Sequence, residues 1–161
     1  MSIKQPKDIS VKTFNGTLNI EWSKNFAHTT NTQFQNAQRF VDSECIRLMK
    51  PYTPFRNGIL EKSVTLGTVI GSGRLVYLHP GARYLYYGMV YGPNIPIFEN
   101  GELIGFFSPK GQPKHPTGAE LVYDTIKHPL AGKLWFERMK ADHQEEIRIG
   151  AEKRAGGIKW T

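Results

Sequence analysis

One long segment carries apolar residues at helical spacing, and it constrains the fold more than any other feature. Apolar side chains recur every three or four residues in the series Phe34, Ala37, Val41, Cys45, Leu48 and Tyr52, and Phe40 and Met49 widen this stripe. This period is that of an amphipathic helix. Pro51 and Pro54 end the pattern, because proline lacks the amide hydrogen that a helix needs. The pattern predicts a helix over about residues 31–50, with N-cap side chains at 29–32, packed against a sheet or a second helix.

A second segment near the C-terminus has the same period. Its series is Trp135, Met139, His143, Ile147 and Gly150. The spacing predicts a helix over about residues 131–153. The sequence AGGIKWT follows, in which glycines end the helix and Trp160 stands next to last. We expect residues 151–161 to form a C-terminal tail, whose exposed tryptophan would need a docking site.

Turn signals divide the other segments into short strands. Asn15-Gly16 lies inside an alternating run at residues 11–22, which predicts either a β-hairpin or an arm that orders only on a partner. A short helical turn and a hairpin over residues 64–77, turning at 71–73, are predicted next. Another Asn-Gly pair in the sequence IFENGELIGFF predicts a small third hairpin.

The run GARYLYYGMVYG at residues 81–92 holds four tyrosines and three glycines. Tyr84 and Tyr87 are three apart, as on one face of a helix, whereas Tyr84 and Tyr86 are two apart, as on one face of a strand. The spacing leaves both structures open. Tyrosine combines a large apolar area with a hydroxyl group, which favours a core or a protein interface over a surface that stacks nucleic-acid bases.

The length of 161 residues suits one domain with a core of useful size. We expect a single domain over 1–161, with a hairpin or arm at 1–24, a core at 31–150 and the tail described above. Residues 92–118 are rich in proline and glycine and predict a long exposed loop. No run of about 18 apolar residues occurs, so we expect no membrane span. The N-terminus lacks the apolar region of a secretory signal.

The chain is basic, with 21 Lys and Arg against 14 Asp and Glu and a net charge of +7. Such a charge permits contact with an anionic partner, including nucleic acid. The basic residues are spread along the chain rather than gathered in one block. The candidate DNA-facing residues are Arg74, Arg83, Lys110 and Lys114. A small basic nucleic-acid-binding module is therefore the alternative to a protein-interaction function.

The sequence holds no enzyme signature. The glycines of GTVIGSGR lack the Lys-Ser/Thr of a phosphate-binding loop. The five histidines show no metal-ligand spacing, and Cys45 is the one cysteine, typical of a small buried side chain. We expect no catalytic residue, no metal and no cofactor.

Three elements, in order, resemble a known family. They are the P-x-x-x-G-x-L-x-x-S element from Pro54 to Ser63, the aromatic-glycine element at Tyr84, Tyr87 and Gly88, and the helix WFERM from Trp135. Over residues 34–150 the chain resembles the minor capsid, or neck, proteins that connect head and tail in long-tailed bacteriophages. The resemblance implies an α+β fold. Its parts would be a small, mostly antiparallel sheet, a long helix packed on it and a second helix near the C-terminus.

The resemblance also implies a function without catalysis. It implies a structural virion protein, assembled in the host cytoplasm, in a sixfold or twelvefold ring that lets the genome pass. Its partners would be further copies of the chain, neighbouring neck, portal-side and tail proteins, and passing DNA through weak contacts. The candidate interface residues are Tyr84, Tyr86, Tyr87, Tyr91, Phe106, Phe107 and Trp160.

Overall fold

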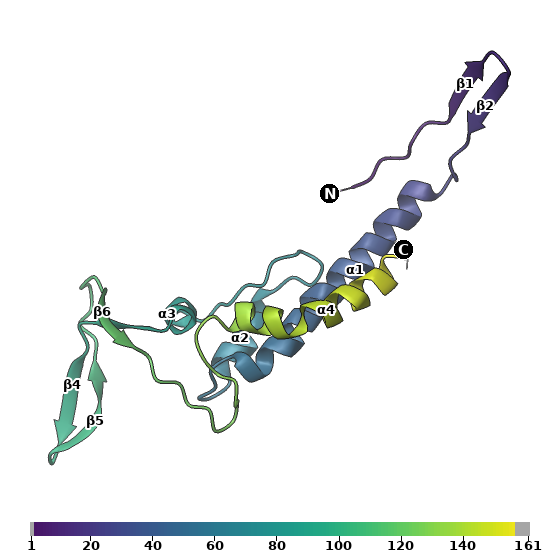
Figure 1. The fold of residues 1–161 in the computed structure, drawn as a ribbon. Helices are drawn as coiled ribbons and strands as arrows, with labels where there is room; N and C mark the ends of the chain where they lie inside the picture. The colour runs from purple at the N-terminus through teal and green to yellow at the C-terminus, as the bar shows by residue number, and fades with distance from the viewer. Residues whose placement is uncertain (1, 157–161) are drawn as a thin grey trace. The chain divides into compact units, whose positions relative to one another are not determined.

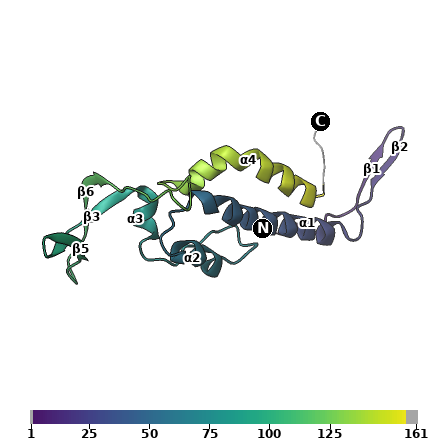
Figure 2. The same cartoon turned by 90° about the horizontal axis from the view of Figure 1, so that it is seen from below.

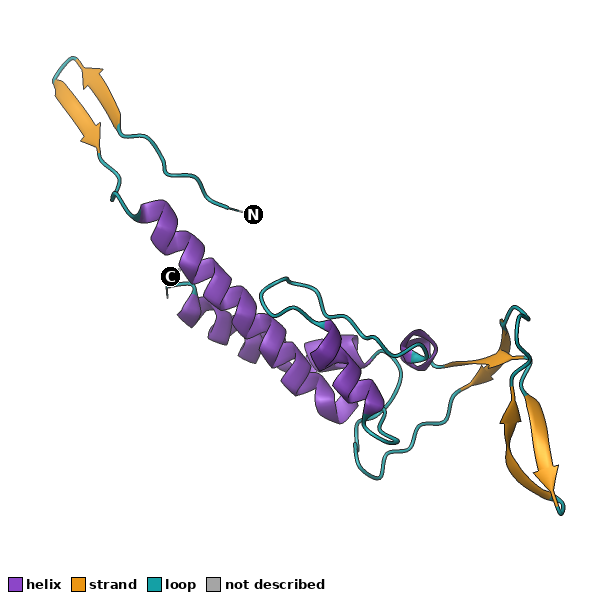
Figure 3. Ribbon diagram, turned by 180° about the vertical axis from the view of Figure 1, so that it is seen from behind, coloured by secondary structure: helices purple, strands orange, loops and turns teal. Residues whose placement is uncertain are grey.

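The computed structural model describes residues 2–156 and confirms an α+β fold, with helices and antiparallel strands (Figure 1). The elements follow one another as β1 (Ile9–Thr13), β2 (Gly16–Ile20), α1 (Phe26–Met49), the 3-10 turn η1 (Lys50–Tyr52), α2 (Ile59–Gly67), α3 (Ala82–Tyr87), β3 (Met89–Gly92), β4 (Ile95–Glu99), β5 (Glu102–Phe107), β6 (His115–Glu120) and α4 (Trp135–Arg154). The strands form three two-stranded sheets, β1–β2, β3–β6 and β4–β5, drawn in orange in Figure 3.

The chain divides into two compact units. The first comprises Met1–Cys45, Val69–Leu75 and His143–Thr161, and the second comprises Ile46–Thr68 and Val76–Asp142. Both α1 and α4 contribute residues to each unit. A single domain over 1–161 therefore stays a prediction.

In the first unit, the long predicted helix begins earlier than expected, at Phe26. Gln5 explains this start, because its side chain accepts a hydrogen bond from the amide of Ala27 at 3.1 Å and donates one to the carbonyl of Ser23 at 2.9 Å. The prediction of caps at 29–32 is wrong, since these residues lie inside the helix. Asn31 instead binds the backbone amide and carbonyl of Ile3, at 2.8 and 2.9 Å.

Within the same unit, the helical stripe of α1 meets α4. A Cβ atom on Gly150 would lie 2.2 Å from the ring of Phe40, so only glycine allows this approach. The guanidinium of Arg154 lies 3.7 Å from the centre of the same ring. In this unit α1 thus packs against a helix, whereas the family resemblance implied a sheet, and the strands of the described chain form two-stranded sheets.

The first hairpin is confirmed. Strands β1 and β2 pair antiparallel from Ile9↔Ile20 to Thr13↔Gly16. The two turn residues are therefore Phe14 and Asn15, so the turn begins one residue earlier than the Asn15-Gly16 pair indicated. Gly16 is the first residue of β2 and has a φ of +154°.

The predicted hairpin at 64–77 is wrong. Residues 59–67 form α2, with Leu60, Ser63 and Val64 buried on one face, and residues 68–78 form no strand. The residues of GSG bind a helix instead of a facing strand. Gly71 and Gly73, both at positive φ, donate their amides to the Asp42 carboxylate at 2.7 and 3.1 Å.

The second unit has a compact core around Trp135 and Met139, which are 1% and 0% exposed. Trp135 donates from Nε1 to the hydroxyl of Tyr77 at 3.1 Å, and the two rings lie 5.5 Å apart. The second predicted helix is confirmed as α4, and the two buried residues are those of its predicted stripe. Met49 and Tyr52, from the end of the first stripe, complete this core.

The tyrosine-rich run forms both structures that its spacing allowed. Residues Ala82–Tyr87 form α3, Gly88 ends it with φ of +72°, and Met89–Gly92 form β3. Two features favour glycine at position 88: the positive φ, and the space, because a Cβ there would lie 2.9 Å from the Lys133 side chain. Figure 2 shows α3 leading into β3, with β6 beside it.

The third predicted hairpin is confirmed and spans β4 and β5. Asn100 and Gly101 both have positive φ, +52° and +85°, which is the geometry of a tight type I′ turn. The segment 92–118 is exposed as expected, with only Gly92, Gly105 and Pro109 partly covered. It is not one loop, however, because it contains this hairpin and the start of β6.

Candidate interaction surfaces

The β4–β5 hairpin is a ribbon whose apolar side chains all face solvent. Its strands pair with each other from Ile95↔Phe107 to Glu99↔Glu102, and no third strand joins them in the described part of the chain. The exposed large side chains are Ile95, Ile97, Phe98, Leu103, Ile104, Phe106 and Phe107. An isolated two-stranded hairpin is marginally stable in water, and contiguous exposed apolar surface marks an interaction site.

The charge of this ribbon differs from that of the rest of the molecule. Residues 93–109 carry Glu99 and Glu102 and no Lys or Arg, so the ribbon has a charge of −2 in a chain of +7. Within residues 2–156, neither carboxylate has an ion-pair or hydrogen-bond partner on another side chain. The tip of the ribbon thus combines apolar side chains with two free negative charges.

The β1–β2 hairpin is a second exposed ribbon, in the first unit. Every residue of both strands is exposed. Its large apolar side chains are Ile9, Val11, Phe14, Leu18 and Ile20. Phe14, at the turn, is fully exposed. The ribbon continues the N-terminal arm that Gln5 and Asn31 fix to α1.

The tyrosines at α3 and β3 divide into two sets. Tyr86 packs edge-on against Trp135, with ring centres 4.7 Å apart, and its hydroxyl donates to Glu137. Burial, and then the hydrogen bond to Glu137, raises the pKa of Tyr86. The ring of Tyr84 lies tilted against that of Tyr91, with ring centres 4.7 Å apart, and Tyr87 is exposed beside Tyr86. Tyr86 therefore packs against the core, whereas Tyr84 and Tyr87 are exposed.

The remaining candidate residues are scattered. Phe106 and Phe107 are exposed on β5, and Trp160 lies outside the described residues. Arg74 belongs to the first unit, and the other three candidate DNA-facing residues, Arg83, Lys110 and Lys114, are exposed in the second unit. The Lys114 ammonium donates to Asn94 at 2.9 Å. The candidate DNA-facing side chains are therefore divided between the two units.

The structure also shows a groove that the sequence did not indicate. It has a volume of about 580 Å³ and collects Phe55, Arg56, Leu60, His79, Leu85 and Val122 from three separate segments of the second unit. Arg56 is exposed there, with no ion pair or hydrogen bond of its side chain within residues 2–156. Lys127 lies close by, 4.5 Å from the centre of the Phe55 ring.

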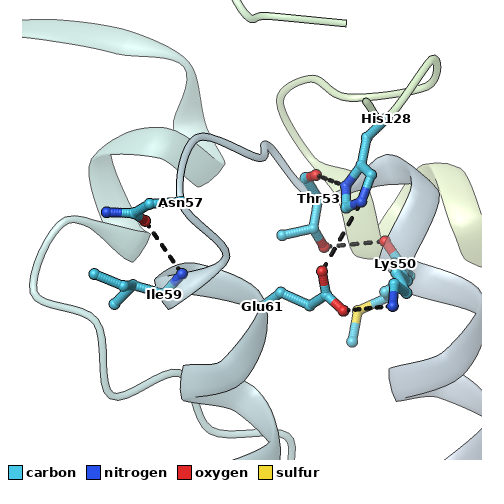
Figure 4. Close-up of polar contacts among 7 residues, drawn as sticks. Lys50, Thr53, Asn57, Ile59, Glu61 and His128 are labelled. Carbon is cyan, nitrogen blue, oxygen red and sulfur yellow. Dashed lines mark hydrogen bonds and ion pairs between the residues drawn. The ribbon is translucent and has the colours of Figure 1, made fainter. Parts of the chain in front are cut away.

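A polar network braces the segments beside this groove (Figure 4). Glu61 pairs with Lys50 at 2.9 Å and lies 3.9 Å from Nε2 of His128. The other ring nitrogen of His128 contacts the carbonyl of Thr53 at 2.7 Å, and the Thr53 hydroxyl donates to the carbonyl of Met49 at 3.0 Å. One ring nitrogen of His128 is thus hydrogen-bonded, the other faces Glu61 beyond hydrogen-bond distance, and the network joins η1, α2 and residue 128.

Three other features of the described part of the chain concern metal-ligand clusters, membrane-spanning helices and reactive thiols. No three His, Cys, Asp or Glu side chains gather closely enough there to hold a metal ion. None of the helices that the structure describes is both long and apolar enough to cross a membrane. The Cys45 thiol is buried, and this burial raises its pKa, which disfavours the reactive thiolate.

Comparison with protein-family models, curated proteins and solved structures finds no match for this chain.

Proposed function

We propose that this protein is a structural virion component of the bacteriophage neck, part of the ring that joins the DNA-filled head to the tail. The observation that carries the proposal is the β4–β5 ribbon, whose seven large apolar side chains are exposed in the isolated chain. A second support is the sequence itself, because the elements at 54–63, 84–88 and 135–139 resemble those of neck proteins.

The energetics favour assembly over a free monomer. Burying one large apolar side chain contributes about 1.5–3 kcal/mol, so docking several of those on β4 and β5 offsets the entropy lost on association. The second ribbon, β1–β2, provides another extension in the other unit. A closed ring needs two different complementary patches on each copy, and a protruding ribbon is suited to be one of them.

The charge distribution fits a channel through which DNA slides. The candidate DNA-facing residues are divided between two units, and they form no basic block in the sequence. Tight phosphate binding needs several cations that act together. In this proposal DNA contacts are weak, and the apolar surfaces serve protein neighbours.

The test uses the purified full-length chain and the virion. We expect oligomers by light scattering, the protein in the neck of the particle by electron microscopy, and no salt-sensitive DNA shift near 0.1 M salt. A monomer that shifts DNA strongly at low salt and weakly at high salt would instead establish the nucleic-acid-binding module.

A further inference from the structure

We propose that the groove around Arg56 is the receptor for the tip of the β4–β5 ribbon of a neighbouring copy. This inference rests on the proposed function and adds to it the pair of surfaces that would hold one subunit to the next. The two surfaces are the groove lined by Phe55, Arg56, Leu60, Leu85 and Val122, and the tip formed by residues 98–103.

The groove has the chemistry of a peptide-binding surface. Most of its lining is apolar, and Val122 at its edge is 98% exposed. Its volume of about 580 Å³ accommodates a few side chains rather than a whole domain. Arg56 supplies a guanidinium that has no partner within residues 2–156. Asp124 also lines the groove but forms no ion pair with Arg56 within residues 2–156, and its carboxylate accepts the amide of Ile126 at 2.8 Å.

The ribbon tip is complementary to the groove in its apolar side chains and in its charge. Phe98 and Leu103 face each other in the strand pair next to the one that precedes the turn, and both are more than half exposed. Glu99 and Glu102 flank the turn and have no partner in the described chain. A guanidinium binds carboxylates through directed, charge-assisted hydrogen bonds, and these are strong where apolar side chains exclude water.

The occupant of the groove is therefore a second copy of this chain. Residues 93–109 have a charge of −2, whereas Arg56 and the neighbouring Lys127 together outweigh the single negative charge of Asp124 and leave the groove a net charge of +1. The contact joins two different patches, so each copy uses its ribbon on one neighbour and its groove on the other. Such heterologous contacts generate a ring when the rotation closes, which is the assembly that the proposed function needs.

The test is an exchange of charge across the contact, in the full-length protein. Arg56→Glu and the pair Glu99→Lys/Glu102→Lys each place like charges in the contact, and each should weaken self-association by about tenfold or more. A chain with all three substitutions, and an equal mixture of the two variants, bring opposite charges together again. We expect both to recover association to within about threefold of the wild type.

The control for Arg56→Glu is Lys140→Glu, which makes the same change of net charge at an exposed site on α4. Sedimentation velocity over a concentration series measures all of the proteins, and circular dichroism checks that each is folded. A photoreactive group at Phe98 should cross-link to residues 54–60 or 121–127 of a second chain.

The possible failures are distinguishable. If the wild type associates but Arg56→Glu behaves as Lys140→Glu does, or if the exchange fails to restore association, the groove is not the receptor and the assembly function stands. If the wild type stays monomeric at every concentration, docking between like copies is wrong, and the location of the protein in the particle decides the assembly function separately.

Discussion

Asp42 on α1 accepts a hydrogen bond from the amide of Gly71 at 2.7 Å, which fastens the 69–75 loop to the helix. The same oxygen accepts the amide of Gly73 at 3.1 Å, and the other oxygen accepts the side-chain amide of Gln38 at 2.7 Å. Asp42 is 3% exposed, so these donors replace water around a buried carboxylate. One helical side chain thus determines the conformation of a loop 29 residues further along the chain.

We expect Asp42→Ala to destabilise the protein by about 2–4 kcal/mol, because it leaves two loop amides without an acceptor. Asp42→Asn keeps one acceptor oxygen and should cost about half as much. Urea denaturation measures both. Hydrogen exchange at Gly71 and Gly73 should accelerate in both variants. The control Glu21→Ala removes an exposed carboxylate, and an equal loss of stability in that variant would contradict this role of Asp42.

The contact of Gly150 with Phe40 predicts that alanine is harmful at a helical position. Alanine improves helix propensity by about 1 kcal/mol over glycine. The new Cβ would lie 2.2 Å from the Phe40 ring, however, and such overpacking costs about 1–3 kcal/mol. We expect Gly150→Ala to lower the free energy of unfolding by up to about 2 kcal/mol, because the cost of overpacking exceeds the gain in helix propensity.

Thermal denaturation of Gly150→Ala in a Phe40→Leu background provides the control. The smaller side chain makes room for the methyl group, so there the alanine should be neutral or stabilising. An unchanged cost in that background would show that the ring is not the cause.

The tyrosines of the second unit predict a loss of stability at alkaline pH. Burial, as the largest cause, raises the pKa of Tyr77, Tyr86 and Tyr123, and the hydrogen bond with Asp142 raises the pKa of Tyr52. The folded state therefore keeps protons that the unfolded chain releases near pH 10. The contribution of these tyrosines to the free energy of unfolding is complete below about pH 10. Above that pH it falls by roughly 1.4 kcal/mol per pH unit for each tyrosine still protonated in the folded state.

Urea midpoints between about pH 8 and 11.5 measure this slope on either side of the ordinary tyrosine pKa, and absorbance near 295 nm follows the tyrosinates. Tyr86→Phe removes one titrating hydroxyl and should reduce the slope above about pH 10, whatever its effect at lower pH. A slope equal to that of the wild type would rule out Tyr86 as a contributor.

The features that the sequence predicted correctly are those set by neighbouring residues. The period of the stripe from Ala37 to Met49 indicates α1 because a helix repeats about every 3.6 residues. The turn at Asn100-Gly101 is predictable because both residues tolerate positive φ. The exposure of residues 92–118 follows from their proline and glycine content.

The features that were missed depend on contacts between distant segments. The GSG turn resembled a hairpin because nothing local reveals that Asp42 accepts its amides. The groove gathers Arg56, His79 and Val122 from three segments, so no spacing in the sequence could indicate it. Within the tyrosine run, sequence could not separate Tyr86 from its neighbours, because the difference is the contact with Trp135.

The exposed side chains of β5 predict a separation of assembly from stability. Phe106→Ser/Phe107→Ser should leave the free energy of unfolding within about 0.5 kcal/mol of the wild type, because both rings are more than half exposed in the isolated chain. Self-association should weaken by about a hundredfold or more, since each buried phenylalanine contributes about 1.5–3 kcal/mol to a contact. Urea denaturation and light scattering measure the two quantities on the same samples. Leu66→Ser, at an exposed site on α2, is the matched control and should change neither. A double variant that associates like this control would show that the β4–β5 ribbon does not hold copies together.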